Sequence, residues 1–253
     1  MCGRIHRFTD VGDIARIFAA DVPEGLNPGP DYNGSPYSWQ LIIRLDKDGK
    51  REIANMRWGL VPREALSDQL PYPTFNAKSD TILEKRSFEE SARHRRCLVP
   101  VDGYYEWDKY VKGKKVAYAL SMKDKSPFCL AGIWSWWMRD GKVLETFAVV
   151  TCEPNPEFEK FHPRMPVILH PEDYDRWLQV GDTEYPPLDL CKPFPAERMH
   201  VWRVNPEVGD IKKNHRGLLD PYVEPPQEPE PPRPEKKRKT KPPAVNPDQG
   251  LLF

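Results

Sequence analysis

A change in composition after Asp220 sets the length of chain that can form a compact core. Ten of the 29 prolines fall within positions 221–247, where acidic and basic runs replace almost all aliphatic residues. Such a segment cannot bury enough apolar surface to order itself, and its prolines favour an extended linker. We therefore predict a folded domain over 1–220, a disordered Pro- and Lys-rich linker over 221–248, and a separate short peptide at 249–253.

The first 220 residues carry a pattern of strands joined by tight turns. Runs rich in β-branched, aromatic and aliphatic residues cover positions 39–45, 97–101, 116–122, 128–137 and 146–151. Asp140-Gly141 lies between two apolar runs and is typical of a hairpin turn. Helical patterns are fewer, over 11–20, 79–93 and 171–180. This order predicts an α+β fold, a single domain with a curled, largely antiparallel sheet or barrel-like core and peripheral helices.

Charge balance and cysteine spacing exclude several classes of protein. With 38 basic and 38 acidic residues the formal net charge is zero, so nucleic acid has to bind a local basic patch. No apolar run approaches the roughly 18 residues of a membrane helix, and the charged first 20 residues are unlike a secretory signal. The five cysteines form no Cys-x-x-Cys pair, so we expect free thiols in a reducing cytosol, with no metal and no cofactor.

The chain opens Met1-Cys2-Gly3-Arg4. Removal of Met1, by an aminopeptidase or by the protein itself, leaves Cys2 with an α-amine and a thiol on adjacent carbons. The amine has a reference pKa of about 7.7–8.0 and the thiol of about 8.5, so both are partly nucleophilic at neutral pH. Such a pair acts as an N-terminal nucleophile, or traps an aldehyde as a Schiff base that the thiol closes to a thiazolidine. The alternative is a cysteine without a role that frays in solvent.

Two polar residues further along stand in unusual surroundings. Asn76 precedes a helical pattern, where it is either a turn or cap residue or a functional amide. Glu106 lies between Tyr105 and Trp107, and strand alternation places its side chain on the face opposite both rings. An apolar pocket would raise the pKa of Glu106 into the range useful for acid–base catalysis, whereas an edge strand would leave it solvated.

A stiff segment follows later in the chain, Phe161-His162-Pro163-Arg164-Met165-Pro166. Its two prolines fix φ and so hold the directions of His162 and Arg164. The histidine is suited to proton transfer near pH 7, and the arginine to binding a phosphate. A lone histidine is more often structural, so the segment gains meaning only together with the others.

Taken in order, these segments resemble one known family, the SOS response-associated peptidase family, over roughly residues 1–217. Its members are abasic-site processing proteins that shield damaged single-stranded DNA. The joint order and spacing of the segments carry the resemblance. The matching segments are Met1-Cys2-Gly3-Arg4, Tyr32-Asn33 with Ser35-Pro36, Trp58-Gly59-Leu60-Val61-Pro62, Asn76-Ala77-Lys78, Glu84-Lys85-Arg86-Ser87-Phe88, Arg96-Cys97-Leu98-Val99-Pro100, Asp102-Gly103-Tyr104-Tyr105-Glu106-Trp107, Ala131-Gly132-Ile133-Trp134 and His162-Pro163-Arg164-Met165-Pro166.

The resemblance implies a mechanism. The Cys2 amine would form a Schiff base with C1′ of a ring-opened abasic sugar, and its thiol would close a stable thiazolidine crosslink to the DNA. By the same resemblance, Asn76 orients the N-terminal cysteine or sugar oxygens. Glu106 moves protons and assists Met1 removal or crosslink reversal. His162 protonates the sugar oxygen that ring opening releases.

The resemblance also implies partners and a location. The residues expected to bind DNA are Arg4, Asn33, Lys78, Arg86, Trp107, Arg164 and Met165. Lys78 stands where the family usually has Arg, which keeps the charge but loses the bidentate fork. We expect a monomer that binds single-stranded DNA with an abasic site during the DNA damage response. It would act in the bacterial cytoplasm at the nucleoid or replication fork, or in the nucleus if the source is eukaryotic, without membrane binding.

The peptide Gln249-Gly250-Leu251-Leu252-Phe253 is similar to the motif by which bacterial proteins dock into the sliding clamp. Leu252 and Phe253 would fill an apolar pocket on the clamp, and Gln249 would supply the polar end. We therefore expect a clamp-binding peptide on a proline-rich tether, which holds the domain near replication forks at a high effective concentration.

Two rival functions stay open from the sequence. One class of glutamine amidotransferases also begins Met-Cys-Gly and uses an N-terminal cysteine for hydrolysis, although Ile usually follows where this chain has Arg4. The other rival is a non-catalytic adaptor with DNA-binding and clamp-binding surfaces only. The adaptor predicts that Cys2→Ala leaves the handling of DNA unchanged.

Overall fold

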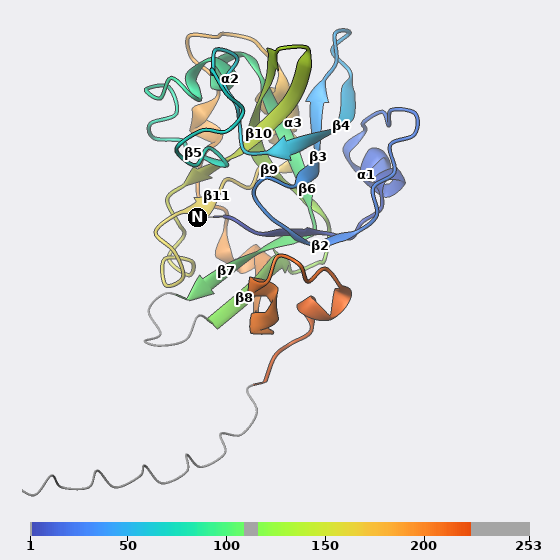
Figure 1. Ribbon diagram of the computed structural model, residues 1–253. Helices are drawn as coiled ribbons and strands as arrows, with labels where there is room; N and C mark the ends of the chain where they lie inside the picture. Colours follow the sequence, from blue (N-terminus) through green and yellow to red (C-terminus); the bar gives the residue numbers. More distant parts are fainter. Residues whose placement is uncertain (1, 109–115, 224–253) are drawn as a thin grey trace, which may run out of the picture. The chain divides into compact units, whose positions relative to one another are not determined.

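The computed structural model describes residues 2–108 and 116–223 (Figure 1). All of these residues except the last belong to one compact unit, which ends at Tyr222. Most of the predicted linker and the whole peptide 249–253 lie outside the described residues. No helix in the described ranges is long and apolar enough to cross a membrane.

The first strand of the domain belongs to a five-stranded sheet. Its order is β12-β8-β7-β1-β2, and each pairing between neighbours is antiparallel. The strands are β1 (Ile5–Arg7), β2 (Asp31–Gly34), β7 (Gly103–Asp108), β8 (Val116–Met122) and β12 (Met199–Val204). Because β1 pairs with β7, the residues just after Cys2 run beside the strand that carries Glu106.

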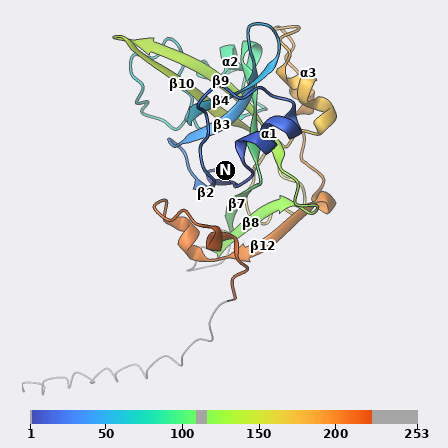
Figure 2. The same ribbon diagram turned by 90° about the vertical axis from the view of Figure 1, so that its right-hand side faces the viewer.

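A seven-stranded sheet is built around the long β9–β10 hairpin. Its strands are β3 (Trp39–Leu45), β4 (Arg51–Trp58), β5 (Asn76–Lys78), β6 (Arg96–Val101), β9 (Phe128–Arg139), β10 (Lys142–Cys152) and β11 (Met165–Pro166). Asp140 and Gly141 form the predicted turn with left-handed φ values of 50° and 76°. Figure 2 shows this hairpin reaching past the rest of the sheet. Pairing in both sheets is mostly antiparallel, so the predicted α+β class is confirmed.

Short helices connect the strands. The α-helices of the described ranges are α1 (Val11–Phe18), α2 (Glu89–His94) and α3 (Tyr174–Leu178), and the 3-10 helices are η1 (Pro171–Asp173), η2 (Leu188–Leu190), η3 (Ala196–Arg198), η4 (Pro206–Gly209) and η5 (Arg216–Leu219). α1 begins where predicted because the Asp10 carboxylate caps it. The helix predicted over 79–93 is wrong for 79–88, which form turns. The Ser79 N–H donates to the Thr151 carbonyl of β10, so this backbone joins the sheet.

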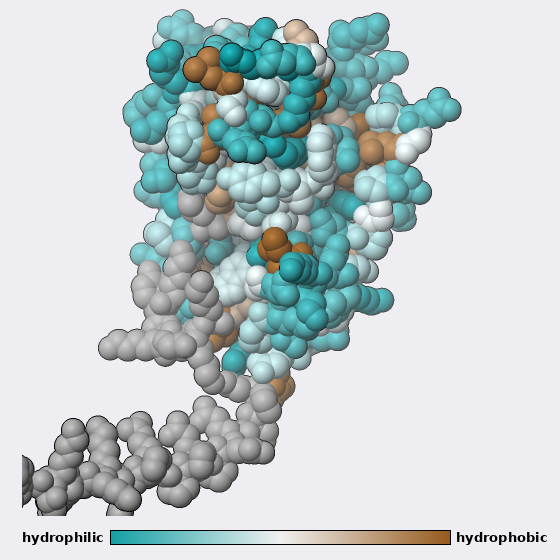
Figure 3. Space-filling view, viewed as in Figure 1, coloured by the Kyte–Doolittle hydropathy of each residue, from teal (hydrophilic) through white to brown (hydrophobic). Residues whose placement is uncertain are grey.

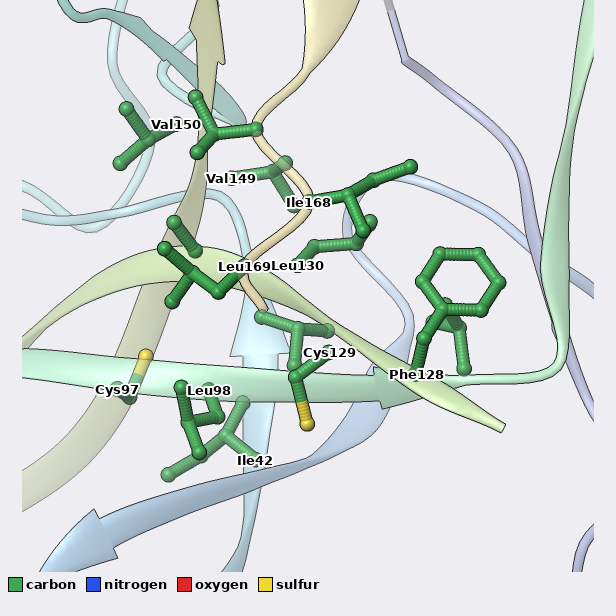
Figure 4. Packing of buried hydrophobic residues seen from close by; sticks show 14 of the residues in the cluster. Ile42, Cys97, Leu98, Phe128, Cys129, Leu130, Val149, Val150, Ile168 and Leu169 are labelled. Atoms are coloured by element: carbon green, nitrogen blue, oxygen red, sulfur yellow. The ribbon is translucent and has the colours of Figure 1, made fainter. Parts of the chain in front are cut away.

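One large apolar cluster draws on both sheets. The five-stranded sheet contributes Ile5, Tyr104 and Leu120. Figure 4 shows part of the other side, where Leu98 and Cys129 are among the packed residues. The outer face seen in Figure 3 is mostly hydrophilic. All five cysteines are free thiols, as the sequence predicted, and four of them are buried.

Candidate active site

Cys2 lies wholly inside the protein, with 0% of its surface exposed. The side-chain amide of Asn76 donates a hydrogen bond of 2.7 Å to the Cys2 carbonyl. The contact holds Cys2 by its backbone and does not occupy its thiol. A cysteine that frays in solvent is therefore excluded.

Two of the predicted segments pair with the end of β10. β5 adds to β10 in parallel, with Asn76 opposite Val149 and Lys78 opposite Thr151. β11 pairs with the same end of β10, where Cys152 lies opposite Met165. The Asn76–Lys78 segment and the segment after His162 are thus joined through one strand.

Glu106 reaches the same region from β7. Its side chain is buried, and alternation along the strand puts it on the same side as Tyr104. Burial raises the pKa of the Cys2 thiol well above its ordinary value, and the negative charge of Glu106 raises it further. The two groups therefore interact electrostatically, and both effects favour the protonated thiol.

His162 is buried and anchored within its own segment. Its Nδ1 lies 3.0 Å from both the backbone N–H and the carbonyl of Arg164, so either neutral tautomer finds a partner there. This local loop fixes the ring plane, as the two neighbouring prolines predicted.

Three of the predicted phosphate ligands keep cationic groups at or near the surface. Lys78 and Arg86 are exposed, and Arg86 lines a cavity of about 790 Å³. The Arg164 guanidinium donates to the Thr151 carbonyl at 2.5 Å and pairs with Asp80 at 2.8 Å. Lys78 lies opposite Thr151 at the end of β10, and Arg164 donates to the carbonyl of the same residue. Both positive charges therefore lie near Asn76.

Arg4 and Asn33, which the sequence predicted to bind DNA, form hydrogen bonds within the protein. Arg4 Nη1 donates to Asn33 Oδ1 and to the Val208 carbonyl, at 2.8 Å each. The Asn33 amide donates to the carbonyls of Asp210 and Lys213 at 3.0 and 2.7 Å. These hydrogen bonds join the start of β1 and β2 to the segment that begins with η4, and they use the polar groups of both side chains.

Met165 and Trp107, two further residues predicted to bind DNA, differ from each other in their degree of exposure. Met165 is 1% exposed and its sulfur accepts a hydrogen bond from the Asn155 N–H, so almost none of its side chain is at the surface. Trp107 is half-buried, and the Arg4 guanidinium lies 5.7 Å from the centre of its ring. Part of Trp107 is therefore exposed.

Tyr104 is a site residue that the sequence reasoning missed. It is fully buried, and the charges of Cys2 and Glu106 act on its hydroxyl. Strand alternation could have identified Tyr104, because it precedes Glu106 by two positions on one strand and so shares its face.

The chain matches known proteins along most of its length. The family described as "SOS response associated peptidase (SRAP)" matches residues 1–211. The abasic site processing protein YoqW of Bacillus subtilis is 33% identical over 227 residues, which cover 88% of this chain and 100% of the relative. The abasic site processing protein HMCES of Gallus gallus is 28% identical over 263 residues, 87% of this chain and 78% of the relative.

Solved structures agree with this match. A protein from Bacteroides thetaiotaomicron has a TM-score of 0.77 and 26% identity, with 88% of this chain and 100% of that chain covered. A protein from Bordetella bronchiseptica has a TM-score of 0.71 and 26% identity, with 81% and 100% covered. The sequence segments, the fold and the buried Cys2 with its Asn76 contact all agree, and the chain belongs to the SOS response associated peptidase (SRAP) family.

Proposed function

We propose that this protein senses abasic sites in single-stranded DNA and forms a covalent thiazolidine crosslink to them through Cys2, once Met1 has been removed. The proposal is carried by one observation: Cys2 is fully buried and held by Asn76, with the charge of Glu106 acting on its thiol. The relatives named abasic site processing proteins support it. The family match also favours this function over a glutamine amidotransferase.

The first step is Schiff-base formation. As the sugar ring opens, the C1′ hydroxyl loses its proton to solvent and becomes an aldehyde, while His162 gives a proton to the former ring oxygen. The Cys2 amine then attacks C1′, and Glu106 carries two protons in turn from the amine nitrogen to the aldehyde oxygen, which leaves as water. The C=N bond that results carries a positive charge when protonated. Asn76 holds the Cys2 carbonyl throughout, so the amine approaches C1′ from a fixed direction.

The second step is ring closure. The thiol gives its proton to Glu106, and the thiolate attacks C1′. The S–C1′ bond forms while the C=N electron pair moves to nitrogen and cancels its positive charge. The product is a five-membered ring with no net charge, which explains a stable crosslink. The same groups, run in reverse, would release the DNA.

Removal of Met1 is the condition for both steps. Glu106 interacts electrostatically with Cys2, and it is therefore our candidate for assisting a peptidase-type removal of Met1 by the protein itself. Lys78, Arg86 and Arg164 are our candidates for binding the phosphates on either side of the lesion, and Trp107 for stacking on a base.

A denaturing gel tests the proposed function. Wild-type protein whose intact mass shows the loss of Met1 is mixed with a single-stranded oligonucleotide that carries one abasic site. We expect a slower band that survives heating, because the thiazolidine is covalent. The matched control is the same strand with a tetrahydrofuran residue, which has no aldehyde and should give no band. A mature wild-type protein that leaves the abasic strand unshifted would contradict the proposal.

We further propose that Gln249, Leu252 and Phe253 dock the protein to a sliding clamp near replication forks. Deletion of 249–253 should abolish capture of the protein by an immobilised bacterial clamp, because the apolar pair is the anchor. The same deletion should leave the crosslinking rate of the domain unchanged. Equal capture of the full-length and shortened proteins would rule this role out.

A further inference from the structure

The hydroxyl of Tyr104 is a buried polar group without a visible use. The side chain is 0% exposed, and the described part of the chain offers its oxygen no hydrogen-bond partner. Leaving a buried hydroxyl unpartnered destabilises a folded protein, so each such group calls for an explanation. A ligand or a changed state of a neighbour is the explanation that fits an active site.

The strand geometry places this hydroxyl at the Cys2 site. Tyr104 and Glu106 project from the same face of β7, and Tyr104 packs in the apolar cluster that also contains Cys2. β7 lies against β1, with Ile5 opposite Tyr104, and the Tyr105 N–H donates to the Arg4 carbonyl at 2.9 Å. Because the pairing is antiparallel, the two residues ahead of Arg4 run along β7 from Tyr105 toward Glu106, the residue that shares a face with Tyr104.

Three acidic groups interact electrostatically with Tyr104. They are Cys2 at the start of the chain, Glu106 on β7 and Cys152 on β10. Burial raises the pKa of Tyr104 well above its ordinary value, and negative charge on these three groups raises it further. The phenol therefore keeps its proton at physiological pH, and it acts toward these neighbours as a hydrogen-bond donor.

We propose that the Tyr104 hydroxyl donates a hydrogen bond to the Cys2 thiolate and so promotes closure of the thiazolidine. This role rests on the proposed crosslinking function. The backbone of Arg4 lowers the pKa of the Cys2 thiol, and Tyr104 would supply a side-chain donor that favours the thiolate further. The bond is absent in the resting structure and forms when the sulfur turns toward C1′, as hydrogen bonds in active sites often tighten only with substrate. Schiff-base formation uses the amine and does not depend on it.

Tyr104→Phe tests this role, because it removes the hydroxyl and keeps the ring. The stable crosslink should form at least about tenfold more slowly at neutral pH, as expected for a lost hydrogen bond to a charged group. The midpoint of the pH–rate profile for closure should move to higher pH, since the thiolate becomes harder to form. The Schiff base, trapped with borohydride, should accumulate within twofold of wild type. Thermal unfolding should be unchanged or shifted upward, because the lost hydroxyl had no partner.

Tyr105→Phe is the matched control. Its hydroxyl lies on the other face of β7 and donates to the Tyr32 carbonyl at 2.8 Å, so its loss should lower stability and leave the closure midpoint in place. The proposal is overturned if Tyr104→Phe closes the ring at the wild-type rate and pH, or if it loses the Schiff base in equal measure. Wild-type protein that gives neither product would overturn the proposed function itself, which separates the two failures.

Discussion

Cys2→Ser and Cys2→Ala proteins that have lost Met1 are expected to form no heat-stable crosslink, a loss of at least about a thousandfold, as when an enzyme loses its nucleophile. Both variants keep an α-amine, so both should still be trapped on an abasic strand when borohydride is present. The reason is that the amine alone forms the Schiff base, whereas only the thiol closes a stable ring. The measurement is a pair of denaturing gels, with and without borohydride.

Cys191→Ser is the matched control for the loss of a thiol. Cys191 is half-buried, and Asn76 does not contact it, so this variant should crosslink like wild type. An adaptor function predicts a different outcome, in which Cys2→Ala handles DNA as wild type does. Full heat-stable crosslinking by Cys2→Ala would therefore contradict the thiazolidine mechanism.

Gly103→Ala is expected to destabilise the domain by about 3 kcal/mol, the upper end of the usual cost of overpacking. A Cβ at position 103 would lie 2.1 Å from the Leu120 carbonyl oxygen and 2.4 Å from His6 Nε2. The first of these atoms is backbone of β8, so the clash is relieved only if β7 moves. Urea unfolding should show a lower midpoint at an unchanged m-value. Because β7 carries Glu106, crosslinking at permissive urea should slow as well.

Gly181→Ala controls for the exchange of glycine for alanine. A Cβ at position 181 meets no atom within 4 Å, and its φ is not left-handed, so the free energy of unfolding should change little or rise slightly. Equal unfolding midpoints for the two variants would show that β7 and β8 adapt to a methyl group, against the expectation.

The strands and the Asp140-Gly141 hairpin were predictable because apolar alternation and turn chemistry are local signals. The helix over 79–93 failed because its apolar spacing is also compatible with turns, and a long-range bond from Ser79 to Thr151 decides between them. The contacts of Arg4 could not be predicted either, because they too are long-range. Its acceptor at Val208 is 204 residues away and is a backbone carbonyl, which no side-chain pattern reveals.

The sequence indicated the candidate site residues better than it indicated the contacts that hold them. Asn76, Glu106 and His162 stood out as polar groups in apolar or rigid surroundings, and the structure buries Glu106 and His162 and brings Asn76 to Cys2. Which residues carry out catalysis stays a prediction until the variants are measured. Tyr104 was overlooked because an aromatic residue in a strand is ordinarily core, and only its unpartnered oxygen sets it apart.

The bond from Arg4 to the Val208 carbonyl has a consequence for the timing of synthesis. A ribosome adds about 5–20 residues per second, so roughly 10–40 s pass between the two ends of that contact. During this interval the bond from Arg4 cannot form, and the residues ahead of β1 are expected to stay accessible to enzymes that trim new chains. The proposed removal of Met1 would then have a window during translation, before folding buries Cys2, and slower translation would lengthen that window.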